Sequence, residues 1–330
     1  MSLAEFQYLR PRTIEEAVAF LARHEGELEI LAGGTDLIPS MRQRLFTPGY
    51  VMDIRGIAEM RGIREDRDAT VIGALTTLTA IERSAQLRRD YPVLTEAAAT
   101  VASPILRNMG TLGGNICLDT RCLWYNQSLT WRQSCGFCIK KDGDLCHVAP
   151  GGTKCWAAFS ADTPPALLCL GAGIEIVGPK GVRRVLLNHF YTNEGDARMN
   201  LARNELVTRV FLPRATAGQR GAYRKLRVRG SIDYPLAGVA VSFRQSNGHI
   251  NEAQVAITAV NPAPFLVPDA HNLLNGHALD ESSAAAAGDA AANISKPLTT
   301  SALTPEYRRE MVKVLTKRAL FSIAPQNHKA

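Results

Sequence analysis

The chain has 330 residues, of which 46% are hydrophobic and 21% are charged, and its formal net charge is +7 at pH 7. It contains no apolar run of about eighteen residues and no basic-then-apolar N-terminal leader, so we expect neither a membrane span nor a secretory signal, and we expect a cytoplasmic protein. Its basic residues are spread along the chain and are not interleaved with aromatic residues, which argues against nucleic-acid binding.

The first half of the chain is predicted to mix helices and strands. Thr13 followed by Glu16 is a capping-box pattern in front of an apolar helical face, which predicts a first helix from about 13 to 24. A short strand over 28–32 then leads into Gly33-Gly34-Thr35-Asp36 and a second helical run. The other elements predicted in this half are strands at 50–54 and 69–73 and helices at 78–85 and 94–101.

The second half is predicted to begin with a helix and a hairpin. Thr163-Pro164-Pro165 favours a helix start, because proline is tolerated in the first turn, and two strands flank Gly178-Pro179-Lys180-Gly181. Past Pro213 we predict strands at 223–228, 239–244 and 253–258 and helices at 269–275, 281–292 and 304–319. We therefore expect an α+β protein with a domain at 1–215, made of subdomains at about 1–56 and 57–215, and a second domain at 216–330.

Two glycine-containing loops have the chemistry of a nucleotide-cofactor site. A glycine pair at a strand end lets the backbone approach a ligand closely, and the amides of the following helix start attract anions. Gly33-Gly34-Thr35-Asp36 has this form, although such turns also serve as plain strand-to-helix connections. Thr111-Leu112-Gly113-Gly114-Asn115 has it again, so we predict that the two loops clasp one dinucleotide from both sides.

Six of the seven cysteines fall between Cys117 and Cys155, and the three tryptophans lie in or directly after the same segment. In a reducing compartment, thiolate-bound metal explains this density better than disulfides do. An iron–sulfur cluster tolerates irregular ligand spacing in a long loop, because the cluster itself fixes the geometry. Zinc is the alternative, since Cys135 and Cys138 form half of a zinc knuckle and His147 adjoins Cys146, but no second tight pair follows.

Three ordered motifs carry a family resemblance that covers nearly the whole chain. They are Ile30-Leu31-Ala32-Gly33-Gly34-Thr35-Asp36-Leu37, Arg107-Asn108-Met109-Gly110-Thr111-Leu112-Gly113-Gly114-Asn115 and Asp162-Thr163-Pro164-Pro165-Ala166-Leu167, followed by Lys225, Arg229, Asp233 and the run 237–240. These motifs resemble the flavin subunit of the molybdenum hydroxylases, the family of xanthine dehydrogenase and carbon monoxide dehydrogenase. The resemblance implies an FAD-binding domain of the vanillyl-alcohol-oxidase/p-cresol-methylhydroxylase type, followed by a C-terminal α+β domain like that of the CO dehydrogenase flavoprotein.

The resemblance also implies roles for single residues. Ile30, Leu31, Ala32, Gly33, Gly34, Thr35 and Asp36 would hold the FAD pyrophosphate, and Thr111, Leu112, Gly113, Gly114 and Asn115 would close the other side. Asp162 would bind a hydroxyl of the cofactor, and Lys225 would either stabilise the reduced flavin or be a plain surface lysine. Val101 stands where xanthine dehydrogenases place an aromatic residue against the flavin ring, whereas Leu206 and Val207 are apolar residues that either face the ring or form strand core.

An insertion of about forty residues, from roughly 118 to 157, interrupts the family pattern and holds most of the cysteines. It resembles the insertion of 4-hydroxybenzoyl-CoA reductase, whose flavin subunit carries an additional [4Fe-4S] cluster. This resemblance implies Cys122, Cys138, Cys146 and Cys155 as the cluster ligands, with Cys135 as the rival to Cys138. Cys117 and Cys169 are expected to be packing residues.

The implied function is electron transfer within a molybdenum enzyme, with no catalytic residue in this chain. Ferredoxin would supply electrons through the [4Fe-4S] cluster and FAD to a [2Fe-2S] small subunit. A molybdopterin-binding large subunit would then reduce 4-hydroxybenzoyl-CoA to benzoyl-CoA, and the family implies a dimer of heterotrimers. The alternative is a flavin subunit of an oxidising aldehyde, xanthine or CO hydroxylase, in which a metal-stabilised insertion docks a partner subunit.

Overall fold

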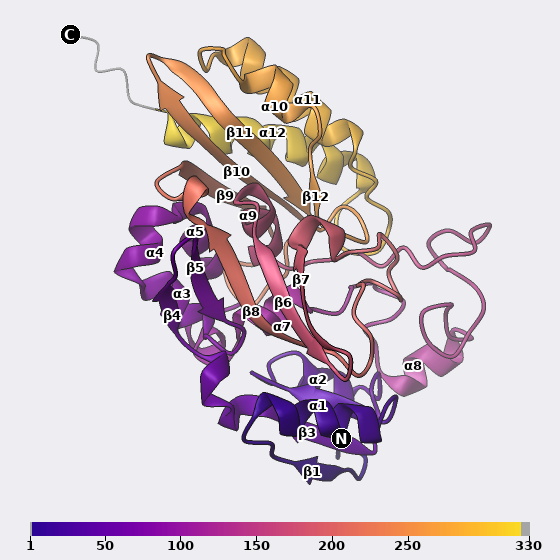
Figure 1. The fold of residues 1–330 in the computed structure, drawn as a ribbon. Coiled ribbons are helices and arrows are strands. Elements are labelled where there is room, and N and C mark those ends of the chain that lie inside the picture. The colour runs from indigo at the N-terminus through magenta and orange to yellow at the C-terminus, as the bar shows by residue number, and fades with distance from the viewer. Residues whose placement is uncertain (1, 325–330) are drawn as a thin grey trace.

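The computed structural model describes residues 2–324 and arranges them around three β-sheets that follow one another along the molecule (Figure 1). The first sheet is parallel, with strand order β1-β3-β2. Helix α1 packs on it, because Ile14, Ala17 and Leu21 are buried in one core with Met52 of β3. The elements of this part are β1 Gln7–Leu9, α1 Ile14–Arg23, β2 Leu28–Leu31, α2 Leu37–Arg42 and β3 Tyr50–Asp53.

The second sheet is antiparallel, with strand order β4-β5-β8-β6-β7. Strand β8 is its central strand and pairs with β5, so chain segments from both sides of the cysteine-rich region meet in one sheet. The elements of this part are β4 Ile63–Glu65, β5 Ala69–Gly73, α3 Leu78–Arg83, α4 Ala85–Asp90, α5 Pro92–Ala99, α6 Pro104–Arg107, α7 Leu112–Ile116, α9 Thr163–Cys169, β6 Gly173–Gly178, β7 Gly181–Leu186 and β8 Leu206–Pro213.

The third sheet is antiparallel, with strand order β12-β11-β10-β9, and the C-terminal helices cover one face of it (Figure 1). A second apolar core fills the space between this sheet and those helices. Asn247 and Gly248 both have positive φ, as a two-residue turn between twisted antiparallel strands requires. The elements are β9 Arg220–Leu226, β10 Ala237–Ser246, β11 His249–Thr258, β12 Phe265–Leu266, α10 Ala270–Leu274, α11 Glu281–Asn293 and α12 Pro305–Ile323.

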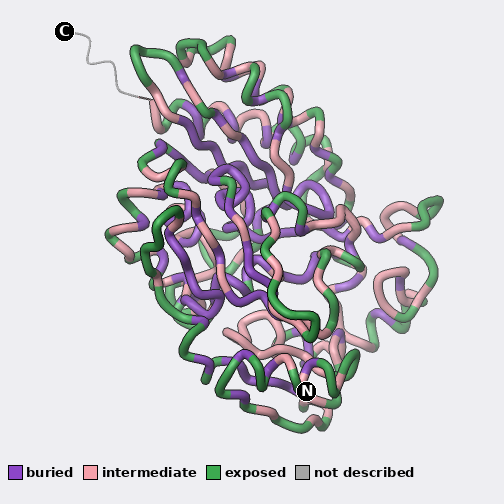
Figure 2. Tube along the Cα trace, viewed as in Figure 1, coloured by how far each residue is buried: buried purple, intermediate pink, exposed green. Residues whose placement is uncertain are grey.

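Residues 122–157, which we call the insertion loop, leave the body of the protein through a narrow stem. The amide of Arg121 donates to the Ala158 carbonyl at 2.7 Å, and the amide of Ala158 donates back to the Arg121 carbonyl at 2.8 Å. The loop contains the short helix α8, Leu129–Ser134, and it projects from the side of the molecule (Figure 1). Much of it is exposed or half-buried, whereas strands β10 and β11 are mostly buried (Figure 2).

The α+β architecture predicted from the sequence is confirmed, with local differences. Thr13 Oγ1 caps α1 by accepting from the Glu16 amide at 3.2 Å, but the Glu16 carboxylate accepts from the Arg12 amide, one residue before the position that a capping box requires. The predicted helix at 78–85 breaks at Ser84, because the Ser84 hydroxyl caps a new helix, α4, by accepting from the Leu87 amide. Strands β1, β4 and β12 escape prediction because each has at most three residues.

Short connections complete the described part of the chain. Among residues 2–324, no helix combines the length and the apolar character that crossing a bilayer requires. The division into domains at 1–215 and 216–330 stays a prediction.

Short 3-10 helices lie at Ile54–Gly56, Ala58–Met60, Leu187–His189 and Arg214–Thr216.

Candidate functional site

A cavity of about 1120 Å³ is lined by both glycine loops, although 74 residues of chain separate them. Leu31, Leu112 and Lys225 are the three predicted cofactor residues that are absent from its described lining. The predicted residues that do line the cavity are Ile30, Ala32, Gly33, Gly34, Thr35, Asp36, Val101, Thr111, Gly113, Gly114, Asn115, Asp162, Leu206 and Val207. The fold therefore gathers most of the predicted set around one space.

The two glycine loops touch at Gly33. A Cβ atom at this position would lie 2.3 Å from the carbonyl oxygen of Met109 and 2.9 Å from the Cα of Gly110, both of which are backbone atoms. Gly34, the next residue, has φ +73°, a left-handed conformation that side chains disfavour. Both glycines are thus required by the backbone, one for the close approach of the loops and one for the turn.

The second loop is held by hydrogen bonds within it and to helix α9. Thr111 Oγ1 accepts from the Gly114 amide at 3.1 Å and so caps α7. The side-chain carbonyl of Asn115 accepts from the amide of Thr163 at 3.1 Å and from its hydroxyl at 2.6 Å. Asn115 therefore uses its oxygen to fix the loop against α9, and its amide group is the part that remains for a ligand.

Asp162 joins the cavity wall to the third sheet. Its two carboxylate oxygens accept from the Tyr223 hydroxyl at 2.8 Å and from the Lys225 ammonium at 3.0 Å, and Lys225 also donates to the Thr100 carbonyl at 3.1 Å. Burial raises the pKa of Asp162, and Lys225 opposes that shift. Burial raises the pKa of Tyr223 as well, and the Asp162 charge adds to it. The side chain of Lys225 is only 3% exposed, so it is not a surface lysine.

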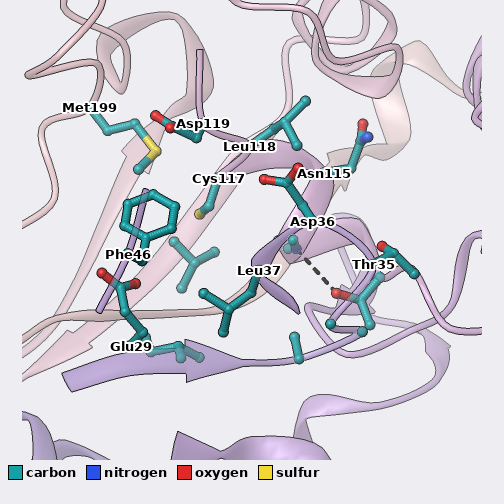
Figure 3. A pocket seen from close by; sticks show the side chains of 18 of the residues that line it. Glu29, Thr35, Asp36, Leu37, Phe46, Asn115, Cys117, Leu118, Asp119 and Met199 are labelled. Atoms are coloured by element: carbon teal, nitrogen blue, oxygen red, sulfur yellow. Dashed lines mark hydrogen bonds between the residues drawn. The ribbon is translucent and has the colours of Figure 1, made fainter. Parts of the chain in front are cut away.

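The cavity also contains residues that sequence reasoning missed. Figure 3 shows Glu29, Phe46 and Met199 gathered on one side of the cavity, away from Thr35 and Asn115. Burial raises the pKa of Glu29, and Arg198 and Arg203 oppose this shift. Most of these residues lie outside the helices and strands, so no periodic pattern in the sequence marks them. They are Phe46, Met199, Arg198 and Arg203. Glu29 is part of β2, where it follows only the strand alternation.

Asp36, Arg121 and Tyr234 form a polar cluster, which we call the latch, at one side of the cavity. Arg121 donates to the Asp36 carboxylate and, at 2.6 Å, to the Tyr234 hydroxyl, while that hydroxyl donates to Asp36 at 3.1 Å. The Arg121 guanidinium also lies over the Tyr234 ring, 4.3 Å from its centroid. The latch connects the first glycine loop, the stem of the insertion loop and the β9–β10 connection.

A second, small cavity lies inside the insertion loop, with a volume of about 20 Å³. Among its lining residues are Cys122, Cys138, Cys146 and Cys155, the four predicted ligands, all of them at most 9% exposed. Cys135 is not part of this lining, and Cys117 lines the large cavity instead. Cys169 is buried in α9, as expected.

Burial disfavours the thiolate form of two of the four cysteines, Cys122 and Cys155. Burial raises the pKa of Cys122 to about 11 and that of Cys155 to about 12. Within residues 2–324, no group of three or more His, Cys, Asp or Glu side chains converges closely enough to hold one metal ion. His147 lines the small cavity, but its ring stacks on Trp124 at 4.4 Å and its Nε2 hydrogen bonds with the Phe137 carbonyl.

Comparison with known protein families assigns both halves of the chain. The family described as the FAD binding domain in molybdopterin dehydrogenase matches residues 4–215. The family described as the CO dehydrogenase flavoprotein C-terminal domain matches residues 221–323. Together these matches account for most of the residues that the structure describes.

Individual relatives extend over nearly the full length of the chain. The carbon monoxide dehydrogenase medium chain of Afipia carboxidovorans is 33% identical, over 96% of this chain and 95% of the relative. The xanthine dehydrogenase FAD-binding subunit of Escherichia coli O157:H7 is 27% identical, over 95% of this chain and 94% of the relative. The structure of reconstituted CO dehydrogenase from Oligotropha carboxidovorans matches with a TM-score of 0.81 and 31% identity, covering 98% of this chain and 99% of that one. The chain belongs to the FAD-binding medium-subunit family of the molybdenum hydroxylases, and it is an oxidoreductase subunit with FAD as its cofactor.

Proposed function

We propose that this chain relays electrons between a molybdenum-containing partner subunit and an external electron carrier, with FAD held in the large cavity. The observation that carries the proposal is that both glycine loops line this cavity and touch at Gly33. Bound FAD supplies the exchange of one or two electrons. The loop amides would face its pyrophosphate, and a volume of about 1120 Å³ suits a ligand larger than those of ordinary sites, which take up about 300–1,000 Å³.

The residues in and directly behind the cavity wall would contact or support FAD in different ways. Asp162 lines the cavity and would bind a cofactor hydroxyl with a lone pair that Tyr223 and Lys225 leave unused. Lys225 would act through Asp162, because the ammonium is bonded to that carboxylate and is not among the lining residues. Val101, Leu206 and Val207 would supply apolar contacts to the flavin.

The names of the relatives favour an enzyme that oxidises its substrate. They include chains of carbon monoxide, xanthine and glyceraldehyde dehydrogenases. We therefore propose that substrate is oxidised on a molybdopterin-binding large subunit and that a [2Fe-2S] small subunit delivers the electrons to this chain. NAD or a quinone would then take them up, and the assembly would be a dimer of heterotrimers.

The insertion loop is proposed to hold a [4Fe-4S] cluster through Cys122, Cys138, Cys146 and Cys155. These thiols line one buried cavity, and each ligand of such a cluster binds a different iron, so the sulfur atoms need not converge on one point. A cavity of about 20 Å³ has room for little more than one water, so the walls would have to move apart to admit a cluster. Zinc bound by fewer thiols is the competing occupant.

The cysteine cavity also favours a second candidate function, a ferredoxin-fed 4-hydroxybenzoyl-CoA reductase. In that reaction two electrons and two protons convert 4-hydroxybenzoyl-CoA into benzoyl-CoA and water, on the partner subunit. The chain would then relay electrons inward from ferredoxin through the insertion loop, in a cytoplasmic and anaerobic setting of aromatic degradation. The oxidising function needs no such entry point for single electrons.

Metal and flavin analysis of the complex, purified without oxygen, tests the cofactor proposals. We expect about four irons and four sulfides per FAD beyond those of the [2Fe-2S] small subunit. Cys155→Ser is expected to lose iron and keep FAD, whereas the matched variant Cys135→Ser keeps both, because Cys135 lies outside the cavity lining. Zinc in place of these four irons, or an unchanged iron content in Cys155→Ser, would contradict the cluster proposal.

Turnover of the same complex then distinguishes the two functions. Reduction of NAD or a quinone, coupled to oxidation of an aldehyde, a purine or CO, would support the oxidising enzyme. Formation of benzoyl-CoA from 4-hydroxybenzoyl-CoA with reduced ferredoxin would support the reductase and contradict the oxidising proposal. FAD absent from the purified complex would contradict both.

A further inference from the structure

Two side chains of the insertion loop separate the large cavity from the cysteine cavity. Tyr125 and Lys140 line both cavities, so each residue faces the proposed flavin site and the proposed cluster site. The Lys140 ammonium lies 4.6 Å from the centroid of the Tyr125 ring. The wall between the two sites thus includes one aromatic ring and one cation, which we call the partition.

The ammonium of Lys140 is buried and held in place by oxygen atoms. Its side chain is 5% exposed, and it donates to Asp119 Oδ1 at 2.8 Å, to the Gly195 carbonyl at 2.7 Å and to the Thr120 hydroxyl. Arg198 contacts the same Asp119 oxygen at 3.3 Å. Two cations, Lys140 and Arg198, therefore contact one carboxylate oxygen beside the partition.

The residue that holds Lys140 also packs on a proposed cluster ligand. A Cβ atom on Gly195 would lie 2.6 Å from Cys155 Sγ, and the Gly195 amide donates to the Cys155 carbonyl at 3.0 Å. Because Gly195 has no side chain, its backbone lies directly against the sulfur. Its carbonyl then fixes the ammonium close to the same cysteine.

We propose that the buried positive charge of Lys140 raises the reduction potential of the cysteine site, so that the site is easier to reduce. Asp119 is proposed to lower the same potential. The inference rests on the [4Fe-4S] proposal. One-electron reduction adds one negative charge to that site and breaks no bond, and the electron comes from the reductant. A nearby cation stabilises the added charge, and the interaction is strong because the low-dielectric interior screens it weakly.

The test is a potentiometric titration of the complex with dithionite, monitored by the paramagnetic resonance of the reduced cluster. Lys140→Met is expected to lower the reduced-to-oxidised ratio at a fixed potential at least tenfold, which corresponds to about 59 mV for a one-electron couple. Lys140→Arg keeps the charge and should restore most of that ratio. Asp119→Asn should shift the ratio in the opposite direction, and it serves as the test if Lys140→Met does not fold.

Lys154→Met is the matched control, because Lys154 directly precedes Cys155 but is only half-buried, over the ring of Trp156. Water screens its charge, so we expect less than a threefold change.

Iron, sulfide and FAD are measured in every variant. An unchanged potential in Lys140→Met and Asp119→Asn with full iron would overturn the inference and leave the cluster proposal standing. Loss of iron from both variants would assign Lys140 a structural role and would also overturn it. Wild-type complex with zinc in the insertion loop, or with no iron beyond that of the [2Fe-2S] small subunit, would overturn the cluster proposal together with this inference.

Discussion

Gly33 shows how one missing side chain positions the cofactor loops. The space that a Cβ would need is occupied by the backbone of Met109 and Gly110, which cannot rotate away as a side chain can. The first loop can therefore pass against the second only with glycine at this position. The requirement is steric, and it would hold for any ligand between the loops.

Gly33→Ala is predicted to weaken FAD binding at least tenfold, because the added methyl group must push the two loops apart. Flavin fluorescence titration of the deflavinated complex measures this affinity, and circular dichroism checks that the fold is kept. Gly151→Ala is the control, since a Cβ there meets no atom within 4 Å. Equal FAD affinity in both variants would show that the contact at Gly33 does not control the site.

Asp53 is a buried carboxylate at the end of β3 that ties the first sheet together. It accepts from the Arg55 side chain at 2.8 and 2.9 Å and from the Tyr8 hydroxyl of β1. These hydrogen bonds, those of Arg55 foremost, hold its pKa well below the ordinary value of 3.8. Its stabilising effect is therefore fully present above pH 3.8 and is lost as the pH falls below that value.

Asp53→Asn is predicted to lower the free energy of unfolding by about 2 kcal/mol at pH 7, the usual loss for hydrogen bonds to a charged group. Urea unfolding at pH 7 and at pH 3 measures the effect, and the difference between wild type and variant should be smaller at the lower pH. The exposed Asp66→Asn serves as the control. A difference that stays constant with pH would show that the carboxylate charge is not the cause.

At the scale of elements, the sequence predicts turns and loops that depend on neighbouring residues. It misses contacts between residues that are far apart in the chain. The β10–β11 hairpin follows from Ser246-Asn247-Gly248, and both glycine loops follow from short motifs at strand ends and helix starts. Lys140 and Arg198 lie in irregular chain, where no period marks a buried residue, and their shared carboxylate becomes visible only in three dimensions. The family resemblance favours Cys138 over Cys135 as a ligand, whereas the spacing leaves that choice open, so the ligand set stays a prediction.

The geometry of the stem allows the insertion loop to be deleted and replaced by a short turn. Arg121 and Ala158 form a mutually hydrogen-bonded antiparallel pair, which is the pair that flanks a two-residue hairpin turn. Replacing residues 122–157 with Asn-Gly should therefore close the chain without moving the body. Loss of Tyr125 and Lys140 removes part of the cavity wall, so FAD should bind more weakly.

This replacement is predicted to give a cooperatively unfolding protein that binds FAD with reduced affinity and contains no iron. Thermal unfolding, flavin titration and metal analysis measure the three properties. The full-length chain with serine in place of all four cavity cysteines is the control, and it separates loss of metal from loss of the loop. An unfolded replacement protein beside a folded control would show that the loop is part of the core.

At the scale of the whole molecule, the latch joins three regions that are distant in sequence. Asp36 ends the first glycine loop, Arg121 forms the stem of the insertion loop, and Tyr234 belongs to the connection between β9 and β10. Asp36 and Tyr234 also line the large cavity. Opening the cavity on this side therefore requires the three regions to separate, and the latch should slow the release of FAD more than it stabilises the fold.

Tyr234→Phe is predicted to speed FAD release by about threefold to tenfold, because the two hydrogen bonds of this exposed tyrosine are exchanged for hydrogen bonds to water. The ring over Arg121 is kept, so the loss is confined to the hydroxyl, which bonds with both Asp36 and Arg121. Release is measured as the recovery of flavin fluorescence after dilution, and global stability is measured by urea unfolding. Tyr307→Phe, at an exposed position in the first turn of α12, is the control and should change neither. If Tyr234→Phe lowered the free energy of unfolding and left the release rate unchanged, the cluster would stabilise the fold without controlling how fast the cavity opens.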